Sequence, residues 1–364
     1  MIKALFIIDH LSDGGAPRSV LKLSRALLAK QVEVTLVSLS ENVSLPIPDG
    51  ARLIVAPFTP KGRWKKLHRY RLHAKVLNEA ISEPGQHFDL VVANLHYSHQ
   101  VVTRSRFANQ AWLCIRTAPW QELVASQQGW RKAIKRQKVK LLYSGRKLIV
   151  LTEGNIASLE KAGVDPEQAT VIPNPLELER IHQLMGEPLA EHELEKQPFC
   201  VYVGRLEMRQ KRLDRLLEAY KKSGITLPLV IIGDGERQDV QDLKRHAAML
   251  GLGPRLRLLG HRANPYPYMR QARALLLSSD YEGLPNVVIE ALACGTPVVS
   301  TDCPTGPRDL LRGELAKGLV PREDTKRFAE AVRDILDDPP SITRETLAGF
   351  APEHIADRYL SLVR

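Results

Sequence analysis

The chain has 364 residues, of which 44% are hydrophobic and 26% charged, and its net charge is +11. This length exceeds what one ordinary hydrophobic core serves, so we predict two domains. No apolar run approaches the roughly 20 residues that a membrane-spanning helix needs. The first residues also lack the small-residue cleavage site of a signal peptide. We therefore expect a protein of the cytoplasm without a membrane span.

The positive charge is unevenly distributed along the chain. Residues 1–175 hold 25 Lys and Arg against 13 Asp and Glu, whereas residues 176–364 hold 27 against 28. All of the excess therefore lies in the first half, which points to an anionic partner for that half rather than to a particular fold. The four cysteines, at positions 114, 200, 294 and 303, show no CxxC spacing. They favour buried, reduced thiols over a metal site or disulfides.

Strands and helices alternate through the first half. Strands are predicted at 3–9, 32–39, 53–56, 88–94, 111–117, 147–152 and 170–173, and helices at 18–30 and 63–81. The helices are indicated by apolar residues at helical spacing. Such alternation predicts a parallel sheet with helices on both faces. Residues 174–175 end the series, and the polar segment 176–198 is predicted to be a linker.

The alternation restarts after this segment. Strands are predicted at 199–204, 229–233, 255–260, 272–279 and 296–302, and helices at 212–221, 236–250, 267–271, 287–294, 324–336 and 352–364. The fold class is α/β, with Rossmann-like domains at 1–175 and 176–351 and the helix 352–364 packing back on the first. Parallel sheets of this kind bind ligands at the carboxyl ends of their strands, so we expect a shared cleft between the domains.

Two carboxylates stand out in the stretch 278–311. Glu282 follows a predicted buried strand, and Glu290 lies about a turn and a half into the next predicted helix. A helix rises about 1.5 Å per residue, which puts the two carboxylates roughly one nucleotide sugar apart. The free N–H groups at the start of that helix suit a phosphate.

Six motifs in order resemble the retaining glycosyltransferases of family 4, of the kind that build bacterial lipopolysaccharide or other surface glycans. Their fold is GT-B, in which two Rossmann-like domains face each other across a cleft. The resemblance covers nearly the whole chain. The motifs are Gly14-Gly15 after the first strand, VIPNP at 171–175, VGRLEMRQKRLDRLLEA at 203–219, IIGDGE at 231–236, LLGHR at 258–262, and EGLPNVVIEALACGTPVVSTDCPTGPRDLL at 282–311.

The resemblance implies catalytic roles for Arg205, Lys211 and Glu282. Arg205 and Lys211 would neutralise the donor diphosphate as the sugar departs, because guanidinium and ammonium groups suit that charge. Solvated cations in a basic loop are the alternative, and Arg209 and Arg212 fit either role.

Both carboxylates would bind hydroxyl groups of the donor. Glu282 would contact the transferred hexose and Glu290 the ribose, since a carboxylate accepts well from two vicinal hydroxyls. The alternative is a helix cap for Glu282 and a surface position for Glu290. The donor site would further include Gly233 and His261 at two strand ends and the backbone of Gly283, Leu284, Pro285, Asn286 and Val287.

In the first domain, Gly14 and Gly15 resemble the glycine pair that lets the family's chain approach the donor phosphate or the acceptor; a structural turn is the alternative. Many relatives carry a His after the fifth strand, facing the reacting sugar. Here that position is Arg116, which puts a catalytic His in doubt. Arg116 and His96 are candidate substrate-binding residues, although a lone His at a strand end is often structural.

The resemblance implies retention by front-face attack, in which the acceptor hydroxyl enters on the side that the diphosphate leaves. No nucleophile backed by a base stands out. No DxD-like pair or His/Asp cluster with metal spacing is visible either. We therefore predict no cofactor and no metal, with Arg205 and Lys211 in place of a cation.

Two basic stretches in the first domain are predicted to be helices, at 61–81 and 130–148. Residues 61–75 hold seven Lys and Arg and no acid, and residues 130–148 hold eight and no acid, with Trp64 and Trp130 among them. Basic helices that bear Trp are typical of elements lying on an anionic membrane surface. A solvated face is the alternative, and nucleic acid is not expected because no nucleic-acid-binding motif accompanies the charge.

The leading hypothesis is a retaining transferase that moves a hexose or N-acetylhexosamine from a nucleotide sugar, by family frequency a UDP sugar, to a membrane-associated glycolipid. The acceptor would be a lipid-linked oligosaccharide or lipopolysaccharide core, and the enzyme would be peripheral on the inner face of the cytoplasmic membrane. The alternatives are transfer to a soluble acceptor, a UDP-sugar 2-epimerase on the same fold, and a sugar-nucleotide sensor.

Overall fold

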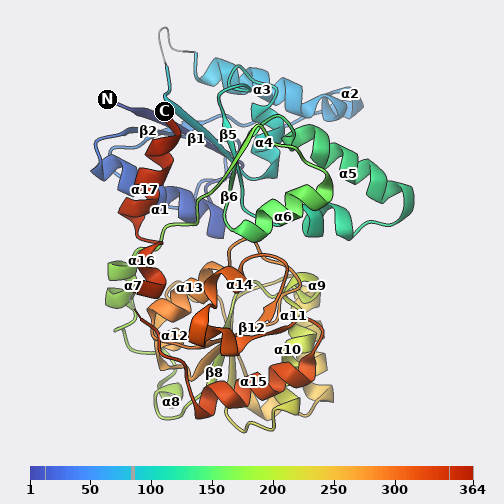
Figure 1. The fold of residues 1–364 in the computed structure, drawn as a ribbon, viewed down its shortest axis with the longest axis vertical. Helices are drawn as coiled ribbons and strands as arrows, with labels where there is room; N and C mark the ends of the chain where they lie inside the picture. The colour runs from blue at the N-terminus through green and yellow to red at the C-terminus, as the bar shows by residue number, and fades with distance from the viewer. Residues whose placement is uncertain (13, 83–86, 344, 364) are drawn as a thin grey trace. The chain divides into compact units, whose positions relative to one another are not determined.

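The structure is a computed structural model that describes residues 1–12, 14–82, 87–343 and 345–363. The chain folds into two compact units, shown in Figure 1. Unit 1 comprises Met1–Pro175 and Phe350–Arg364, and unit 2 comprises Leu176–Gly349. The sequence prediction placed the first boundary after residue 175 and the second after residue 351.

Unit 1 is built on a seven-stranded sheet in the order β3-β2-β1-β4-β5-β6-β7, and each of its pairings is parallel. Its strands are β1 (Lys3–Ile8), β2 (Glu33–Ser38), β3 (Arg52–Val55), β4 (Leu90–Asn94), β5 (Trp112–Ile115), β6 (Lys147–Val150) and β7 (Gln168–Val171). Its helices are α1 (Gly15–Ala29), α2 (Gly62–Leu67), α3 (Arg69–Ala80), α4 (His96–Val102), the π-helix η1 (Trp120–Ala125), α5 (Gly129–Tyr143), α6 (Glu153–Ala162), α17 (Pro352–Leu360) and the 3-10 helix η4 (Ser361–Val363).

The central strands of this sheet are apolar because both of their faces are covered. Every residue of β4 is buried. On one face, Leu77 of α3, Val101 of α4 and Val139 of α5 pack into a common core with the strands. The last helix, α17, contacts α1, and the two lie side by side in Figure 1. Its Tyr359 hydroxyl lies 3.7 Å from the Cys114 Sγ, which ties the end of the chain to β5.

Unit 2 repeats this architecture with a six-stranded parallel sheet in the order β10-β9-β8-β11-β12-β13. Its strands are β8 (Cys200–Val203), β9 (Leu229–Ile232), β10 (Leu256–Gly260), β11 (Ala274–Leu277), β12 (Val298–Asp302) and β13 (Leu319–Pro321). Its helices are α7 (Leu178–Leu184), α8 (His192–Glu195), α9 (Met208–Lys211), α10 (Leu213–Lys222), α11 (Arg237–Met249), η2 (Gly253–Arg255), α12 (Tyr266–Gln271), α13 (Asn286–Ala293), α14 (Pro307–Leu310), η3 (Gly313–Gly318), α15 (Thr325–Asp337) and α16 (Glu345–Ala348). The predicted α/β class with two Rossmann-like units is confirmed.

Both predicted basic helices differ from the structure. The helix expected at 61–81 is interrupted at His68, because α2 buries no residue and packing holds only α3. The helix expected at 130–148 ends at Tyr143. The Ser144-Gly145 turn follows, with Gly145 at φ 64°, and Lys147 already belongs to β6, where pairing with β5 and β7 holds it. Among the described residues, no helix combines the length and the apolar character needed to cross a bilayer.

The segment predicted as a linker is part of unit 2. Its helix α7 contacts α12 and α13. The Asn264 side chain donates to the Leu184 carbonyl at 2.9 Å, and the Gln271 side chain donates to the Leu194 carbonyl at 3.0 Å. Several short or polar elements were not predicted either, among them α4, α6 and the edge strand β13, which lack the long apolar periodicity that marks a core element.

Candidate active site

The strand order of unit 2 reverses between β8 and β11, since β9 and β10 follow on one side of β8 and β11 to β13 on the other. Connections that leave neighbouring strands in opposite directions open a crevice where parallel α/β sheets bind their ligands. Arg205 lies in the loop after β8, Lys211 ends the short helix α9 that follows this loop, and Glu282 lies in the loop after β11. The structure therefore places these predicted site residues beyond the carboxyl ends of β8 and β11, where the strand order reverses.

Lys211 and Glu282 are in direct contact. The Lys211 Nζ lies 2.6 Å from the Glu282 Oε1, and the two side chains are only 14% and 9% exposed. The Ser279 hydroxyl donates to the same Glu282 oxygen at 2.6 Å. Charges shielded from water interact more strongly than exposed ones. The Lys211 ammonium and the Glu282 carboxylate therefore hold each other in a defined position.

Backbone and side-chain hydrogen bonds hold the two loops together. The Ser278 hydroxyl donates to the Lys211 carbonyl at 2.7 Å, and the Asp280 amide donates to the Gln210 carbonyl at 2.8 Å. The Gln210 side chain in turn donates to the Tyr281 carbonyl at 3.0 Å. The position of Lys211 relative to Glu282 is thus set by contacts on both sides of the pair.

A buried arginine supports the same junction. Arg215 on α10 is 3% exposed. Its Nη1 donates to the Ser278 carbonyl at 3.1 Å and to the Asp280 Oδ1 at 2.8 Å, and its Nη2 lies 3.2 Å from the Glu323 carboxylate. Arg212, at φ 49°, also pairs with Asp280 and with Asp214, which raises the pKa of the Arg212 guanidinium.

Arg215 and Asp280 were not singled out from the sequence, although a signal was present. Asp280 follows a buried apolar strand by three residues, and Arg215 lies one helical turn after Arg212. An acid after a buried strand and two arginines one helical turn apart indicate a network of ion pairs between the end of that strand and that helix. Arg215 and Asp280 form an ion pair with each other. Their role is therefore to position the loops rather than to bind a substrate.

Arg205 lies apart from the Lys211–Glu282 pair. Its side chain is 67% exposed, lies 2.9 Å from the Glu207 carboxylate and donates to the Gln210 side chain at 3.2 Å. Glu290 is half-buried on α13, and the Tyr266 hydroxyl lies 3.5 Å from its Oε1. Of the predicted donor-binding side chains, the structure therefore brings Lys211 and Glu282 into contact, while Arg205 is bonded within its own loop.

Gly233 is required by the approach of another loop. A Cβ at Gly233, whose φ is 143°, would lie 1.9 Å from the Gly204 carbonyl oxygen. The same two loops are joined by the Leu206 amide, which donates to the Asp234 carbonyl at 2.8 Å. The His261 amide donates to the Asp234 side chain at 3.2 Å. Gly233 and His261 thus lie at the carboxyl edge of the sheet, where the prediction put them.

The predicted phosphate-binding turn leads into α13. Gly283, Leu284 and Pro285 are buried, whereas Asn286 and Val287, the first residues of the helix, are half-buried. A neighbouring glycine at φ 95° fits against this turn, since a Cβ at Gly306 would lie 3.0 Å from the Gly283 carbonyl oxygen. In the described part of the chain, no side chain caps α13.

Gly14 and Gly15 start the first helix of unit 1. Gly14 caps α1 with φ 144°, and Gly15 is its first residue. A Cβ at Gly14 would meet only the Pro17 ring, at an ordinary 3.6 Å. The glycine is therefore needed for its backbone conformation, as a structural turn requires.

Arg116 and His96 both bond to unit 1 itself. The Arg116 guanidinium donates to the Asn94 Oδ1 through Nε at 3.1 Å and Nη2 at 2.9 Å, and to the Asn174 Oδ1 at 2.5 Å. The His96 Nδ1 lies 3.2 Å from the Tyr143 hydroxyl. Arg116 thus joins the end of β4 to the end of the VIPNP motif, a structural task that the sequence did not reveal.

Two titratable groups of unit 1 are shielded from water: Asp9, which follows β1, and His99 on α4, which follows β4. The Asp9 carboxylate accepts from the Ser98 amide at 2.7 Å and from the Tyr97 amide at 3.3 Å. Burial raises the pKa of Asp9 to about 6 despite these bonds. Burial lowers the pKa of His99 to about 3, while its Nε2 donates to the Ala93 carbonyl at 3.1 Å.

Within the described residues, His, Cys, Asp and Glu side chains form no group of three or more that could hold a metal ion.

Comparisons with known proteins agree with this geometry. Residues 13–180 match the family model described as Glycosyltransferase Family 4, and residues 197–338 match the model described as Glycosyl transferases group 1. The chain is 28% identical over 345 residues to the Campylobacter jejuni N-acetylgalactosamine-N,N'-diacetylbacillosaminyl-diphospho-undecaprenol 4-alpha-N-acetylgalactosaminyltransferase, covering 93% of this chain and 91% of that protein.

A second relative and a solved structure extend the comparison. The Lipopolysaccharide 1,6-galactosyltransferase of Salmonella typhimurium is 29% identical over 172 residues, which is 46% of each chain. The Sucrose-phosphate synthase of Thermosynechococcus elongatus has the same fold, with a TM-score of 0.74 at 22% identity over 100% of this chain and 95% of that chain. The two family models, the sheets of both units and these relatives agree: the chain carries a glycosyltransferase family 4 domain and a glycosyl transferases group 1 domain, and it is a glycosyltransferase of the GT-B fold.

Proposed function

We propose that the chain transfers a hexose or N-acetylhexosamine from a UDP sugar to a membrane-associated glycolipid, with retention of the anomeric configuration. The observation that carries the proposal is the shielded Lys211–Glu282 pair beyond the ends of β8 and β11, where the strand order reverses. It joins a cation suited to a diphosphate to a carboxylate suited to sugar hydroxyls. The names of the Campylobacter jejuni and Salmonella typhimurium relatives support a lipid-linked or lipopolysaccharide acceptor.

The donor diphosphate binds at Lys211 and near the start of α13, where backbone N–H groups suit a phosphate. Arg205 is exposed enough to turn from Glu207 toward the same phosphates. Glu290 accepts from the ribose hydroxyls, and Glu282 accepts from the hexose. A bound diphosphate competes with Glu282 for Lys211, so donor binding releases this carboxylate for the sugar.

Transfer breaks the bond between the anomeric carbon and the diphosphate oxygen and forms a bond from that carbon to the acceptor oxygen on the same side. The acceptor proton passes to an oxygen of the leaving diphosphate. Lys211 and Arg205 stabilise the charge that develops on the diphosphate, which is where a preorganised cation lowers a barrier most. In this proposal, these two side chains replace a metal ion, and the reaction proceeds without added divalent cation.

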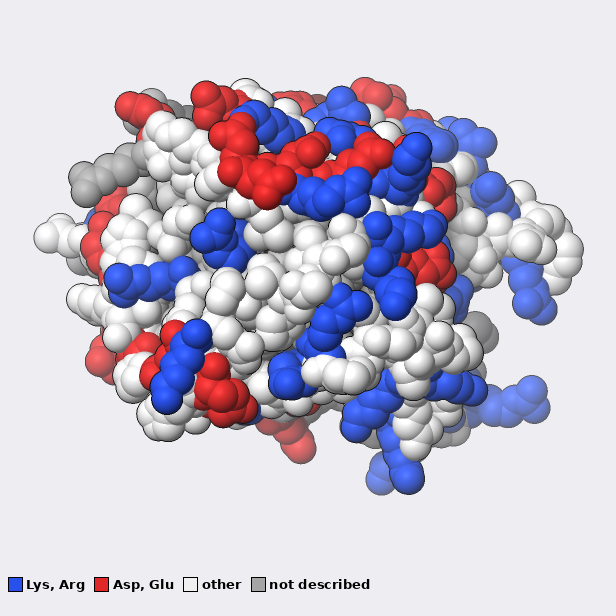
Figure 2. Space-filling model, turned by 90° about the horizontal axis from the view of Figure 1, so that it is seen from below, with Lys and Arg blue, Asp and Glu red and all other residues white. Residues whose placement is uncertain are grey.

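The acceptor is held by unit 1 at a membrane surface. The exposed large apolar side chains of unit 1 include Trp64 and Leu67 on α2 and Trp130, Ile134 and Leu141 on α5, each among Lys and Arg residues. Figure 2 shows acidic and basic side chains together along the upper part of one face of the molecule, and basic ones without acidic ones at its lower right edge. Each basic residue near an anionic membrane contributes about 1 kcal/mol. We place the protein on the inner face of the cytoplasmic membrane.

A panel of nucleotide sugars tests the donor. Thermal unfolding is followed with UDP-glucose, UDP-galactose, UDP-N-acetylglucosamine, UDP-N-acetylgalactosamine and GDP-mannose. A ligand at 100 times its dissociation constant stabilises the folded state by about 2.7 kcal/mol. We expect a UDP sugar to raise the melting temperature most. A GDP sugar acting alone would contradict the assignment of UDP.

Vesicle flotation and product analysis test the acceptor. We expect the protein to float with vesicles that contain phosphatidylglycerol and to remain behind with phosphatidylcholine alone. Equal recovery in the unbound fraction would contradict membrane binding and favour a soluble acceptor. Epimerised sugar formed without any acceptor would instead identify a UDP-sugar 2-epimerase.

A further inference from the structure

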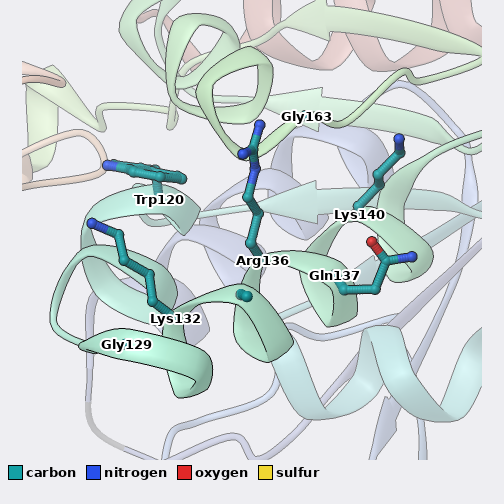
Figure 3. A pocket seen from close by; sticks show the side chains of 8 residues that line it. Trp120, Gly129, Lys132, Arg136, Gln137, Lys140 and Gly163 are labelled. Atoms are coloured by element: carbon teal, nitrogen blue, oxygen red, sulfur yellow. The ribbon is translucent and has the colours of Figure 1, made fainter.

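A pocket in unit 1 lies outside the donor site. It has a volume of about 440 Å3 and lies between η1, α5 and the end of α6, a size common for small-molecule sites. Figure 3 shows Arg136 reaching from α5 toward Gly163 and Lys132 lying near the Trp120 ring, while Lys140 extends on the other side of Arg136. We call it the α5 pocket; its lining residues are Trp120, Gly129, Lys132, Ala133, Arg136, Gln137, Lys140 and Gly163.

All charged residues that line the pocket are cations. Lys132, Arg136 and Lys140 are four residues apart along α5 and therefore lie in one row. No carboxylate is among the lining residues. Among the described residues, none of these three cations forms an ion pair with a carboxylate. Like charges at this spacing destabilise a helix by a few tenths of a kcal/mol per pair, which a bound anion would reverse.

Two contacts orient the cations before any ligand arrives. The Arg136 Nε donates to the Ala162 carbonyl at 3.2 Å, at the end of α6. Gly163, at φ 78°, leaves room for the guanidinium, since a Cβ there would lie 3.3 Å from the Arg136 Nη2. The Lys132 Nζ lies 5.4 Å from the Trp120 ring, within the range of a cation–π contact. The remaining guanidinium N–H groups are suited to a phosphate.

The helix that lines the pocket also carries the exposed apolar row. At about 100° per residue, Trp130, Ile134 and Leu141 lie on one face of α5, and the buried Val139 lies on the opposite side. The pocket row lies on a flank between these faces. A helix that rests in a membrane interface on its apolar row would hold this flank at the depth of the lipid phosphates.

We propose that the α5 pocket binds a phosphate or diphosphate group carried by a lipid. This inference rests on the proposed function for the lipid's role as acceptor, since the pocket then holds the diphosphate through which the glycan is linked. The same chemistry can come from a phospholipid head group of the bilayer. The two sources share the phosphate, and they are separated by experiment.

The test compares two triple variants of the full chain with equal loss of charge from the same helix. The pocket variant is Lys132→Gln, Arg136→Gln and Lys140→Gln. The flank variant is Arg131→Gln, Lys135→Gln and Lys138→Gln, three exposed residues on the other flank of α5. Binding of inorganic diphosphate is measured by calorimetry with UDP present in excess, so that the donor site is filled. Circular dichroism melting of both variants reports folding.

We expect the pocket variant to bind diphosphate about tenfold more weakly or worse, as the loss of charged hydrogen bonds predicts, and the flank variant to keep the wild-type affinity within about twofold. Equal weakening in both variants would overturn the proposal, because charge alone would then explain the binding. An absence of diphosphate binding by the wild type would overturn it as well.

The source of the phosphate is decided with two lipid probes. A selective rise in KM of the pocket variant for a prenyl-diphosphate-linked sugar assigns the pocket to the acceptor. A selective loss of flotation with phosphatidylglycerol vesicles, at unchanged acceptor KM, assigns it to the bilayer head groups. The thermal shift with UDP sugars tests the proposed function separately, since it depends on unit 2 and neither variant changes unit 2.

Discussion

The cations of the two units differ in what they face. In unit 2, Lys211 faces Glu282, Arg212 faces Asp214, and Arg215 faces Asp280 and Glu323. In unit 1, the three cations of the α5 pocket form no ion pair among the described residues. The net charge is +12 for residues 1–175 and −1 for residues 176–364, so carboxylates that could pair with cations are scarcer in the first part.

The difference distinguishes two uses of positive charge. A cation with an internal counter-ion is held in one geometry, so it can present its charge to a ligand at a defined place or fix a loop. Cations that lack an internal counter-ion repel each other, and an anion bound from outside lowers this repulsion. Lys211 belongs to the first kind and the α5 pocket to the second, so the charge of Lys211 is balanced within unit 2, while the pocket in unit 1 would gain from an anion supplied from outside.

The largest effect is expected from breaking the supporting network. Asp280→Ala leaves the 3% exposed Arg215 without its main counter-ion, and loss of one partner from a buried pair costs about 3 kcal/mol or more. Chemical denaturation measures the free energy of unfolding. Asp214→Ala is the matched control, because its partner Arg212 is 31% exposed and such pairs contribute about 1 kcal/mol or less. Equal losses in the two variants would show that burial of the cation is not what matters.

Removal of the donor-site cation should abolish most of the activity. Lys211→Ala takes away the positive charge at the diphosphate, and turnover should fall about 100-fold or more, the scale for one preorganised stabilising group. Release of nucleotide from the donor measures this. Lys221→Ala, an exposed lysine on α10, should keep wild-type turnover. A near-normal rate for Lys211→Ala would remove the residue from the proposed mechanism.

Neutralising the Glu282 carboxylate should weaken the interaction with the sugar without weakening the binding of the nucleotide. Glu282→Gln keeps an acceptor for Ser279 but weakens the bonds to the hexose, so kcat/KM should fall about tenfold. Free UDP should bind as well as before or better, because Lys211 no longer has a competing anion 2.6 Å away. Calorimetry with UDP supplies the second measurement. A parallel loss of UDP affinity would move Glu282 from the sugar to the nucleotide.

The smallest effect is a dependence of stability on pH from Asp9. Its pKa in the folded chain is about 6, above the ordinary value of 3.8, so the folded state holds the proton more tightly. The contribution to stability is present at low pH and is lost as pH rises through about 6; between pH 5 and 7 it should decrease by about 1 kcal/mol. Asp9→Asn should lack this decrease. Parallel stability curves for the two proteins would contradict the raised pKa.

The alternation of elements predicted the two parallel sheets because buried parallel strands are short apolar runs that composition reveals. The predicted boundaries of helices were wrong where strand pairing, rather than the spacing of apolar residues, determines the end of an element. Lys147 continues a basic helical pattern yet pairs with Trp112 and Gln168 in the sheet. The break at His68 follows from the absence of packing on α2, which no local pattern records.

The candidate site was accessible from the sequence in part. Lys211 and Glu282 lie 71 positions apart, and only the order of β8 and β11 in the sheet brings them together. The motif predicted their proximity, but not that they form an ion pair. The environment of Arg116, set by Asn94 and Asn174 from two other parts of unit 1, depends on tertiary contacts that the motif does not contain.

The most direct test of the proposed reaction follows the sugar itself. The wild type is incubated with a radiolabelled UDP sugar, chosen by the thermal-shift panel, and with bacterial membranes, and the label is partitioned between organic solvent and water. We predict label in the lipid extract with the wild type and with Lys221→Ala, and none above background with Lys211→Ala. Label that stays in the aqueous phase as free sugar or soluble glycan, or equal lipid labelling by Lys211→Ala, would contradict transfer to a lipid acceptor by the Lys211–Glu282 site.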